Sequence, residues 1–364
     1  MYLCSLILLS VLIKFGHSTG IPQVKLNDGR QVQNFGLGTW LGFTKEVIPI
    51  GDEVQKAVEW AIDAGYRHID TAHIYADEDQ VRPTVGHGKR EDIFITTKLW
   101  NDRHAKDAVI PALKESLAKL NLDYVDLYLI HWPFAIFVSI LTRFQGGSIL
   151  LIVSQKLASR EVFYTHISKK KLPNGTFDDV DYLDTWAAMI EARKQGLTKS
   201  IGLSNFNQQM LERIISQSSV KPAMLQVEIN LNLQQPSLLE YCRSQDIKVT
   251  GYSPFGSLFP SKARPNAPAP RIDDPALVKI AQKYNKSVPQ IVLRYLVELG
   301  VIPIPKSVTK SRIEQNIDVF DFQLTEDEKS VLRSFDKNYR SIDLPFWSKS
   351  GYNDPQGSDE TYSN

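Results

Sequence analysis

The stretch Val125-Asp-Leu-Tyr-Leu-Ile-His131 is an apolar run that ends abruptly on a polar residue. A short, continuous apolar run of this kind is typical of a strand that is buried on both faces. The segment before it places Val109, Leu113, Leu117 and Leu120 at helical spacing. A helix followed by a buried strand is the repeating unit of a parallel sheet with helical crossovers.

The same unit recurs on both sides of this stretch. Strands are expected at Tyr66–Asp70, Phe94–Thr97, Lys199–Leu203, Ala223–Glu228, Ile247–Tyr252 and Val301–Pro303, and helices at Asp52–Ala64, Gln208–Ser216, Ser237–Arg243, Pro275–Tyr284, Val288–Glu298 and from Lys310. With Phe35-Gly-Leu-Gly38 as the first strand, the chain holds eight units. Closure into a (β/α)8 TIM barrel leaves no exposed sheet edge. The turn Asn27-Asp-Gly29 predicts a β-hairpin before the barrel.

Composition describes an ordinary soluble protein with a sizeable core. Hydrophobic residues make up 43% of the 364 positions and charged residues 23%. A single α/β barrel commonly has this length, so one domain is expected. The formal net charge is +1 without a basic stripe, which argues against nucleic-acid binding. No metal site is expected.

The start of the chain forms a separate segment. Tyr2–Ile13 is apolar but too short to span a bilayer. Lys14 and the small residues of Gly16–Gly20 follow, which predicts a signal peptide over residues 1–19, a secreted protein and a domain over residues 20–364. The usual basic start is missing. The alternatives are a membrane-associated segment or an artefactual extension of a cytoplasmic protein.

Cleavage of the leader would remove Cys4 and leave Cys242 alone, so no disulfide framework is expected. Asn174 and Asn285 begin glycosylation sequons that are usable only in a secreted chain.

Polar side chains end three successive predicted strands. Asp70, Lys98 and His131 stand at these ends, and Tyr75 follows Asp70 by five residues. The carboxyl ends of the strands of a (β/α)8 barrel converge on one mouth. An ammonium lowers the pKa of a nearby phenol, so Lys98 is expected to make Tyr75 a stronger acid. Asp70 supplies the counter-ion that a buried lysine needs, and His131 can orient a substrate oxygen.

Taken singly, these residues also have structural explanations. Asp70 suits a loop cap, Lys98 a solvated strand end and His131 a core imidazole. Their occurrence together at neighbouring strand ends favours a proton-transfer site.

The motifs GYRHIDTAHIY, KLW, LIHWP, SIGLSNFN, QVEIN, GYSPFGS and IPIPKS, in this order, resemble those of the aldo-keto reductases. The resemblance extends from about Pro22 to about Trp347. It implies a (β/α)8 barrel with a C-terminal loop over its mouth, an NADPH cofactor, a small-molecule carbonyl substrate and a monomer. Tyr75 would be the general acid, tuned by Lys98 and Asp70, with His131 positioning the carbonyl.

The resemblance also assigns residues to the cofactor. Ser204, Asn205 and Gln226 would hold the carboxamide, Tyr252 would stack on the nicotinamide, Ser253, Phe255 and Ser257 would line the pyrophosphate path, Lys306, Ser307 and Arg312 would grip the 2′-phosphate, and Gln315 and Asn316 would lie near the adenine. The family usually has an acid where Gln315 stands. Two cations within seven residues suit a phosphate, which favours NADPH over NADH.

Aromatic residues are expected to form the substrate pocket, although about half of them suit the core equally well. They are Trp40, Trp100, Trp132, Phe346 and Trp347. His131 in place of a glutamate favours carbonyl reduction over reduction of a conjugated double bond. The glycines of Gly36–Gly42 have the wrong spacing for a Rossmann fingerprint and suit the first turn of the barrel.

Two segments depart from the family pattern. Pro83 and two glycines oppose a helix over residues 82–89, so part of an outer helix is missing or rebuilt. After Trp132-Pro133 the chain has an excess of roughly two dozen residues, within an atypical apolar segment over 137–171. This segment could cover the active site or recruit a partner, but its composition favours a retained intron or an assembly error.

The function expected from the sequence is NADPH-dependent reduction of an aldehyde or ketone. The leader combined with this barrel is similar to insect haemolymph reductases of 3-dehydroecdysone, which makes a steroid ketone the preferred substrate and a general aldehyde the second. The alternative from another class is a cofactor-binding subunit or structural protein on the same fold.

Overall fold

The computed structural model describes residues 20–42, 51–82, 89–136 and 177–342. Its main feature is an eight-stranded parallel sheet in the order β12-β11-β10-β9-β6-β5-β4-β3, which follows the chain. The strands are β3 (Leu37–Gly38), β4 (His68–Asp70), β5 (Phe94–Leu99), β6 (Val125–Ile130), β9 (Thr198–Ser204), β10 (Met224–Glu228), β11 (Lys248–Tyr252) and β12 (Val301–Pro303).

The first and last strands meet, so the sheet closes on itself. The backbone nitrogen of Gly36 donates to the Pro303 oxygen at 3.0 Å, and that of Gly38 donates to the Pro305 oxygen at 3.2 Å. A Cβ at Gly38 would lie 2.8 Å from the Ile304 oxygen, so glycine permits this close approach. The predicted (β/α)8 barrel is confirmed.

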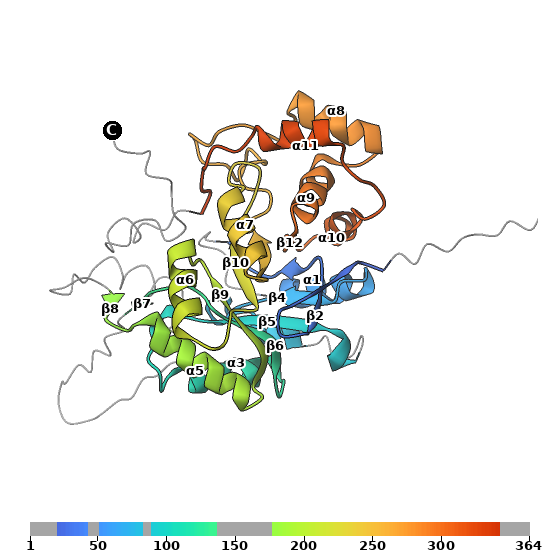
Figure 1. Cartoon of the computed structure of the whole chain (residues 1–364). Coiled ribbons are helices and arrows are strands. Elements are labelled where there is room, and N and C mark those ends of the chain that lie inside the picture. The colour runs from blue at the N-terminus through green and yellow to red at the C-terminus, as the bar shows by residue number, and fades with distance from the viewer. Residues whose placement is uncertain (1–19, 43–50, 83–88, 137–176, 343–364) are drawn as a thin grey trace, which may run out of the picture.

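Helices surround the strands, as Figure 1 shows for α3 and α5 on one side and for α9 and α10 on the other. They are α1 (Glu53–Asp63), α2 (Glu78–Val81), α3 (Val109–Leu120), α5 (Tyr182–Lys194), α6 (Gln208–Gln217), α7 (Pro236–Ser244), α8 (Pro275–Tyr284), α9 (Val288–Glu298), α10 (Lys310–Ile317) and α11 (Glu326–Arg333). In α6, Asn207 caps the helix by accepting from the Met210 nitrogen, while Leu211 and Ile214 are buried. Burying each such side chain stabilises the fold by about 1.5–3 kcal/mol.

A hairpin closes the amino end of the barrel. Its strands β1 (Gln23–Lys25) and β2 (Gln31–Gln33) pair antiparallel, as the sequence predicts. Leu26 and Val32 of the hairpin pack against Phe94 and Met224, the first residues of β5 and β10. The opposite, carboxyl end of the barrel is therefore the end where a ligand can enter.

Some elements differ from the sequence expectation. The ladder between β5 and β6 continues through Leu99, so Lys98 lies inside β5 rather than at its end. Helices α5 and α11 are not among the predicted elements, although Asp181 caps the first and Thr325 and Glu328 form a capping box at the second. Helix α2 ends before Pro83, in agreement with the expected interruption of an outer helix.

Several expectations fall on residues outside the described ranges. These are the leader over residues 1–19, the segment over 137–171, most of 82–89, the sequon at Asn174, and the pocket residues Phe346 and Trp347. The antiparallel pair β7 (Ala135–Ile136) and β8 (Phe177–Asp178) joins the two ends of the 137–176 stretch, just after the fourth barrel strand. Within the described ranges, no helix is long and apolar enough to cross a bilayer.

Candidate active site

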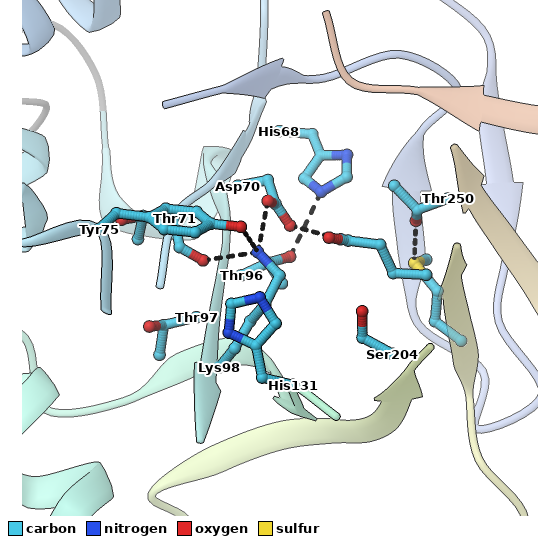
Figure 2. Close-up of polar contacts among 12 residues, drawn as sticks. His68, Asp70, Thr71, Tyr75, Thr96, Thr97, Lys98, His131, Ser204 and Thr250 are labelled. Atoms are coloured by element: carbon cyan, nitrogen blue, oxygen red, sulfur yellow. Dashed lines mark hydrogen bonds and ion pairs between the residues drawn. The ribbon is translucent and has the colours of Figure 1, made fainter. Parts of the chain in front are cut away.

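The predicted polar residues meet at the carboxyl end of the barrel. Asp70 is the last residue of β4, Lys98 is the penultimate residue of β5, and His131 directly follows β6. Tyr75 ends the 3-10 turn His73–Tyr75, which leaves the barrel after β4. Three neighbouring strands and one turn therefore place all four side chains in one group, which Figure 2 shows.

Lys98 lies at the centre of the group and is fully buried. Its ammonium donates to Asp70 Oδ1 at 2.6 Å, to the Thr71 backbone oxygen at 2.9 Å and to the Tyr75 hydroxyl at 3.3 Å. An ammonium has three hydrogens, and these contacts use all of them. Gln226 Nε2 donates to the second oxygen of Asp70 at 2.7 Å, so it helps to hold the counter-ion. The Lys98 side chain is thereby fixed in one orientation.

Burial has the largest influence on the pKa values of this ion pair. It raises the pKa of Asp70 and lowers the pKa of Lys98, while the opposite charge of the partner opposes each shift. The contact of 2.6 Å and the hydrogen bond from Gln226 compensate both charges, so we assign the ionised form to each residue.

The pKa of Tyr75 differs from the sequence expectation. Burial raises this pKa well above 10, and the charges of Asp70 and Asp77 raise it further. This direction is opposite to the shift expected from Lys98 alone, whose ammonium donates to the Tyr75 hydroxyl at 3.3 Å. The Tyr75 hydroxyl therefore carries its proton at neutral pH.

His131 presents a neutral imidazole beside this hydroxyl. Burial lowers the pKa of His131 well below 6.5, and Lys98 and His104 lower it further. The ring lies edge-on to the Tyr75 ring, with centroids 5.7 Å apart and an interplanar angle of 79°. A neutral imidazole can donate one hydrogen bond but does not compete with the phenol as the acid.

Aromatic side chains lie around His131, whose ring centroid is 5.2 Å from that of Trp100. Trp40 stacks on Tyr75 with ring centroids 6.2 Å apart. Trp100, Trp132 and Phe134 form a separate apolar cluster against which Ile74, Ile136 and Ile342 pack. The four polar residues therefore lie beside an apolar wall, which consists of Trp100, Trp132 and Phe134.

A buried carboxylate holds the backbone at Ser341 and Ile342, next to this apolar cluster. Glu228, at the end of β10, accepts from the Ser341 nitrogen at 2.8 Å, from the Ile342 nitrogen at 3.1 Å and from Asn230 Nδ2 at 3.0 Å. The Ser341 hydroxyl donates to the same carboxylate. Sequence analysis did not single out Glu228, although its position at a strand end is the same signal that identified Asp70.

Replacing Glu228 with glutamine is expected to release Ser341 and Ile342. The glutamine amide has one NH₂ group where glutamate has a second acceptor oxygen, so some backbone donors of Ser341 and Ile342 would face another donor. The loss of such a hydrogen bond costs about 1–3 kcal/mol of stability. Amide hydrogen exchange at Ser341 and Ile342 should accelerate by at least about tenfold, while exchange in α9 stays unchanged. Equal exchange rates in the two proteins would contradict the tether.

The predicted carboxamide and stacking residues form a second polar group beside the first. Asn205 Nδ2 donates to the His131 backbone oxygen at 2.9 Å, and the Tyr252 hydroxyl donates to Asn205 Oδ1 at 2.9 Å. Asn205 and Ser253 both adopt left-handed backbone conformations, with φ of 65° and 47°. Such conformations are costly outside glycine and cluster at functional sites.

The predicted phosphate residues lie after β12 and along α10. Lys306 is exposed and Ser307, whose hydroxyl accepts from the Thr309 nitrogen at 3.1 Å, is buried. Arg312 and Gln315 are exposed on α10, where Asn316 is buried. Partial desolvation lowers the pKa of Lys306, and the positive charge of Lys262, which sequence analysis missed, lowers it further. An anion beside Lys306 would favour the charged form of its ammonium.

Ser257 is buried, and Phe255 packs edge-on against Phe259 at 5.5 Å in the loop after β11. Ser253, Phe255 and Ser257 all belong to this loop, which joins β11 to α8. Within the described ranges, no group of three or more His, Cys, Asp or Glu side chains could hold a metal ion.

Comparisons with known proteins agree with this geometry. The model of the Aldo/keto reductase family matches residues 34–337. Aldo-keto reductase AKR2E4 of Bombyx mori is 46% identical over 332 residues, which are 90% of this chain and 96% of that protein. Aldo-keto reductase family 1 member A1 of Xenopus tropicalis is 40% identical over 348 residues, covering 93% and 96%.

Two solved structures of silkworm and related reductases have the same fold. Bombyx mori AKR2E4 in complex with NADP has a TM-score of 0.78 at 45% identity, covering 93% of this chain and 99% of that one. AKR2E5 complexed with NADPH has a TM-score of 0.78 at 38% identity, covering 91% and 92%. The chain therefore belongs to the aldo/keto reductase family, whose members are NADP-dependent oxidoreductases that act on carbonyls.

Proposed function

We propose that this chain reduces an aldehyde or ketone to the alcohol with NADPH, and that Tyr75 is the general acid. The observation that carries the proposal is the set of three hydrogen bonds from Lys98 to Asp70, Thr71 and Tyr75, placed beside the neutral His131. NADPH supplies the hydride that is added to the carbonyl carbon. The side chains of the protein supply the proton and hold the carbonyl oxygen.

Each of the four residues has one task in this proposal. The His131 N–H donates to the carbonyl oxygen and fixes its direction. The Tyr75 hydroxyl transfers its proton to that oxygen as negative charge develops there, and the resulting phenolate is stabilised by the Lys98 ammonium at 3.3 Å. Asp70 keeps Lys98 charged inside the barrel. Solvent then restores the Tyr75 proton.

The residues beside the site fit the proposed cofactor. Tyr252 is half-buried, and its hydroxyl donates to Asn205 Oδ1, which fixes the orientation of a ring proposed to stack on the nicotinamide. Lys306 fits a phosphate, because an anion would offset the partial desolvation and the positive charge of Lys262 that lower its pKa. Ser204 and Gln226 are paired across β9 and β10, and Asn205 and Gln226 contact the catalytic residues His131 and Asp70.

Replacing Lys306 with alanine is expected to weaken NADPH binding by about tenfold to a hundredfold, because one charge-assisted hydrogen bond is worth about 1.5–3 kcal/mol. Binding of NADH, which lacks the 2′-phosphate, should change by less than about twofold. The matched control is Lys310→Ala, since Lys310 is exposed and faces Glu314 at 3.9 Å. Fluorescence titration of all three proteins measures the effect. An equal loss of affinity for both nucleotides would contradict a 2′-phosphate contact.

The apolar wall supports a bulky apolar carbonyl as substrate. Trp100, Trp132 and Phe134, with Ile342 packed on them, offer contact area without charge. A steroid ketone such as 3-dehydroecdysone fits such a wall, and a general aldehyde is the second candidate.

Secretion forms part of the proposal, on the basis of the leader over residues 1–19. Asn285, in the second sequon, is exposed at the end of α8, where a glycan can be attached. Expression of the full chain in insect cells should give a protein in the medium that begins near residue 20. A cell-retained protein with an intact leader would contradict it.

Turnover distinguishes the proposal from a non-catalytic role on the same fold. The wild-type chain should oxidise NADPH in the presence of members of a panel of aldehydes and steroid ketones, and each alcohol should be identified by mass spectrometry. A protein that binds NADPH tightly but oxidises it with no carbonyl in the panel would support the binding-subunit alternative. Shortening the 137–171 segment then tests whether that segment inhibits turnover.

A further inference from the structure

Asp77 is a buried carboxylate that the proposed mechanism does not use. Its residue is fully buried, and it precedes α2 at the position where aspartate commonly caps a helix. The side chain makes no capping hydrogen bond. Instead, Asp77 Oδ1 accepts from the Thr71 hydroxyl at 2.7 Å, in the direction of the barrel interior. The carboxylate therefore serves something other than the helix.

Thr71 connects this carboxylate to the ammonium of the site. Its hydroxyl donates to Asp77, and its backbone oxygen accepts from Lys98 Nζ at 2.9 Å. Thr71 is fully buried, and its own nitrogen is held by the Thr96 oxygen at 2.9 Å, so it has little freedom to move. A change in the charge of Asp77 is thus transmitted over a short and rigid path in a region of low dielectric constant.

Three buried carboxylates lie near Lys98, and among the described residues Asp77 differs from the other two in its lack of a cation. Asp70 is in direct contact with Lys98, and Glu78 lies 3.7 Å from the Lys119 ammonium. Within the described ranges, Asp77 has no cation within 4 Å, and its Oδ2 has no hydrogen-bond partner. Burial without a cation in contact favours the protonated form of a carboxyl group.

Burial raises the pKa of Asp77 to about 6, and the charge of Glu78 also raises it, while the hydrogen bond from the Thr71 hydroxyl and the charge of Lys98 oppose this. The titratable groups around it come from four elements: Asp70 of β4, Tyr75 of the 3-10 turn, Glu78 of α2 and Lys98 of β5, with His73 and Lys119 facing Glu78. The negative charge of Asp77 in turn raises the pKa of Tyr75.

We infer that Asp77 is a positioning residue that acts on Lys98 through Thr71, and that its negative charge holds back the proton of Tyr75. This inference rests on the proposed function of Tyr75 as the acid. When Asp77 takes up a proton, the Tyr75 proton is released more easily and reduction becomes faster. In the reverse direction, alcohol oxidation by the Tyr75 phenolate becomes accessible at lower pH.

The first test is the pH dependence of the chemical step in Asp77→Asn. In single-turnover reduction, the wild-type rate should rise by about threefold as pH falls through 6. Asp77→Asn, whose amide oxygen can still accept from Thr71, should show the higher rate throughout and no inflection near pH 6. The matched control is Asp126→Asn, since Asp126 is a half-buried carboxylate near the start of β6 that pairs with Arg90. This control should keep the wild-type inflection.

The second test does not require turnover. With fluorotyrosine in place of tyrosine, the fluorine signal that disappears in Tyr75→Phe is the signal of Tyr75. It should shift with an inflection near pH 6 in the wild-type protein and should not do so in Asp77→Asn. Thr71→Val removes the hydroxyl that stabilises ionised Asp77, so the inflection should move to higher pH.

Stability gives an independent measure of the ionisation of Asp77. The folded-state pKa of about 6 lies above the ordinary value of 3.8, so folding with an ionised Asp77 is penalised. This loss of folding stability is absent when pH lies below the ordinary pKa of 3.8, and it grows until pH passes the folded-state pKa of about 6. The melting temperature of Asp77→Asn relative to wild type should therefore increase between these two pH values and then stay level.

The outcomes separate the two claims. A wild-type protein without turnover at any pH would contradict the proposed function, while the fluorine signal would still decide on Asp77. Wild-type and Asp77→Asn signals with the same inflection would overturn the inference, even if both proteins reduce carbonyls. If Asp77→Asn does not fold, Thr71→Val decides. A pH of inflection in its Tyr75 fluorine signal that equals the wild-type value or lies below it would also overturn the inference.

Discussion

Replacing Tyr75 with phenylalanine is expected to lower kcat for carbonyl reduction by about a hundredfold to ten-thousandfold. The substitution removes only the hydroxyl that donates the proton. The ring keeps its place between Trp40 and His131, whose ring centroids lie 6.2 Å and 5.7 Å away. NADPH affinity should therefore change by less than about twofold, as measured by fluorescence titration beside steady-state kinetics.

The matched control for Tyr75→Phe is Tyr284→Phe. Tyr284 donates to Glu328 at 2.7 Å between α8 and α11 and takes no part in the site. Its kcat should equal that of the wild-type protein. If Tyr75→Phe retains wild-type kcat in single-turnover experiments, another group supplies the proton and the assignment of the acid is refuted.

Replacing Lys98 with methionine is expected to abolish turnover and to destabilise the fold at the same time. The change leaves Asp70 with a buried charge and no cation, which costs about 3–5 kcal/mol. The Thr71 backbone oxygen also loses its donor at 2.9 Å. Denaturant unfolding gives the free-energy change, and stopped-flow kinetics gives the rate of reduction.

The double variant Lys98→Met with Asp70→Asn separates stability from catalysis. A neutral amide at position 70 needs no counter-ion, so most of the lost stability should return. Turnover should not return, because no ammonium stabilises the Tyr75 phenolate. A double variant that regains both stability and turnover would show that the ion pair supports only the fold.

The barrel and the position of its site were predictable because both depend on local patterns. Each strand is an apolar run, and the carboxyl ends of parallel strands must meet at one mouth. Asp70 and His131 therefore reach the site by strand position alone. Helix α5 was missed even though Tyr182, Trp186 and Met189 recur at helical spacing after the Asp181 cap. Its signal lies next to the unusual segment over 137–171.

The electrostatics of the site could not be predicted from residue types. The sequence places Lys98 near Tyr75, but burial decides the pKa of the phenol, and burial depends on the whole barrel. The same holds for Gln226, whose amide nitrogen donates to Asp70, a contact that no residue type announces. The contact of the Thr71 backbone oxygen with Lys98 carries no sequence signal, because every residue has such an oxygen.

The most direct test of the account is the transfer of deuterium from NADPH that is deuterated at the reactive carbon of the nicotinamide. The wild-type chain is incubated with this cofactor and with aldehydes and steroid ketones, and the alcohols are analysed by mass spectrometry. The account predicts one deuterium on the carbinol carbon, formed by the wild-type protein and lost in Tyr75→Phe. Tight NADPH binding without any deuterated alcohol would contradict it.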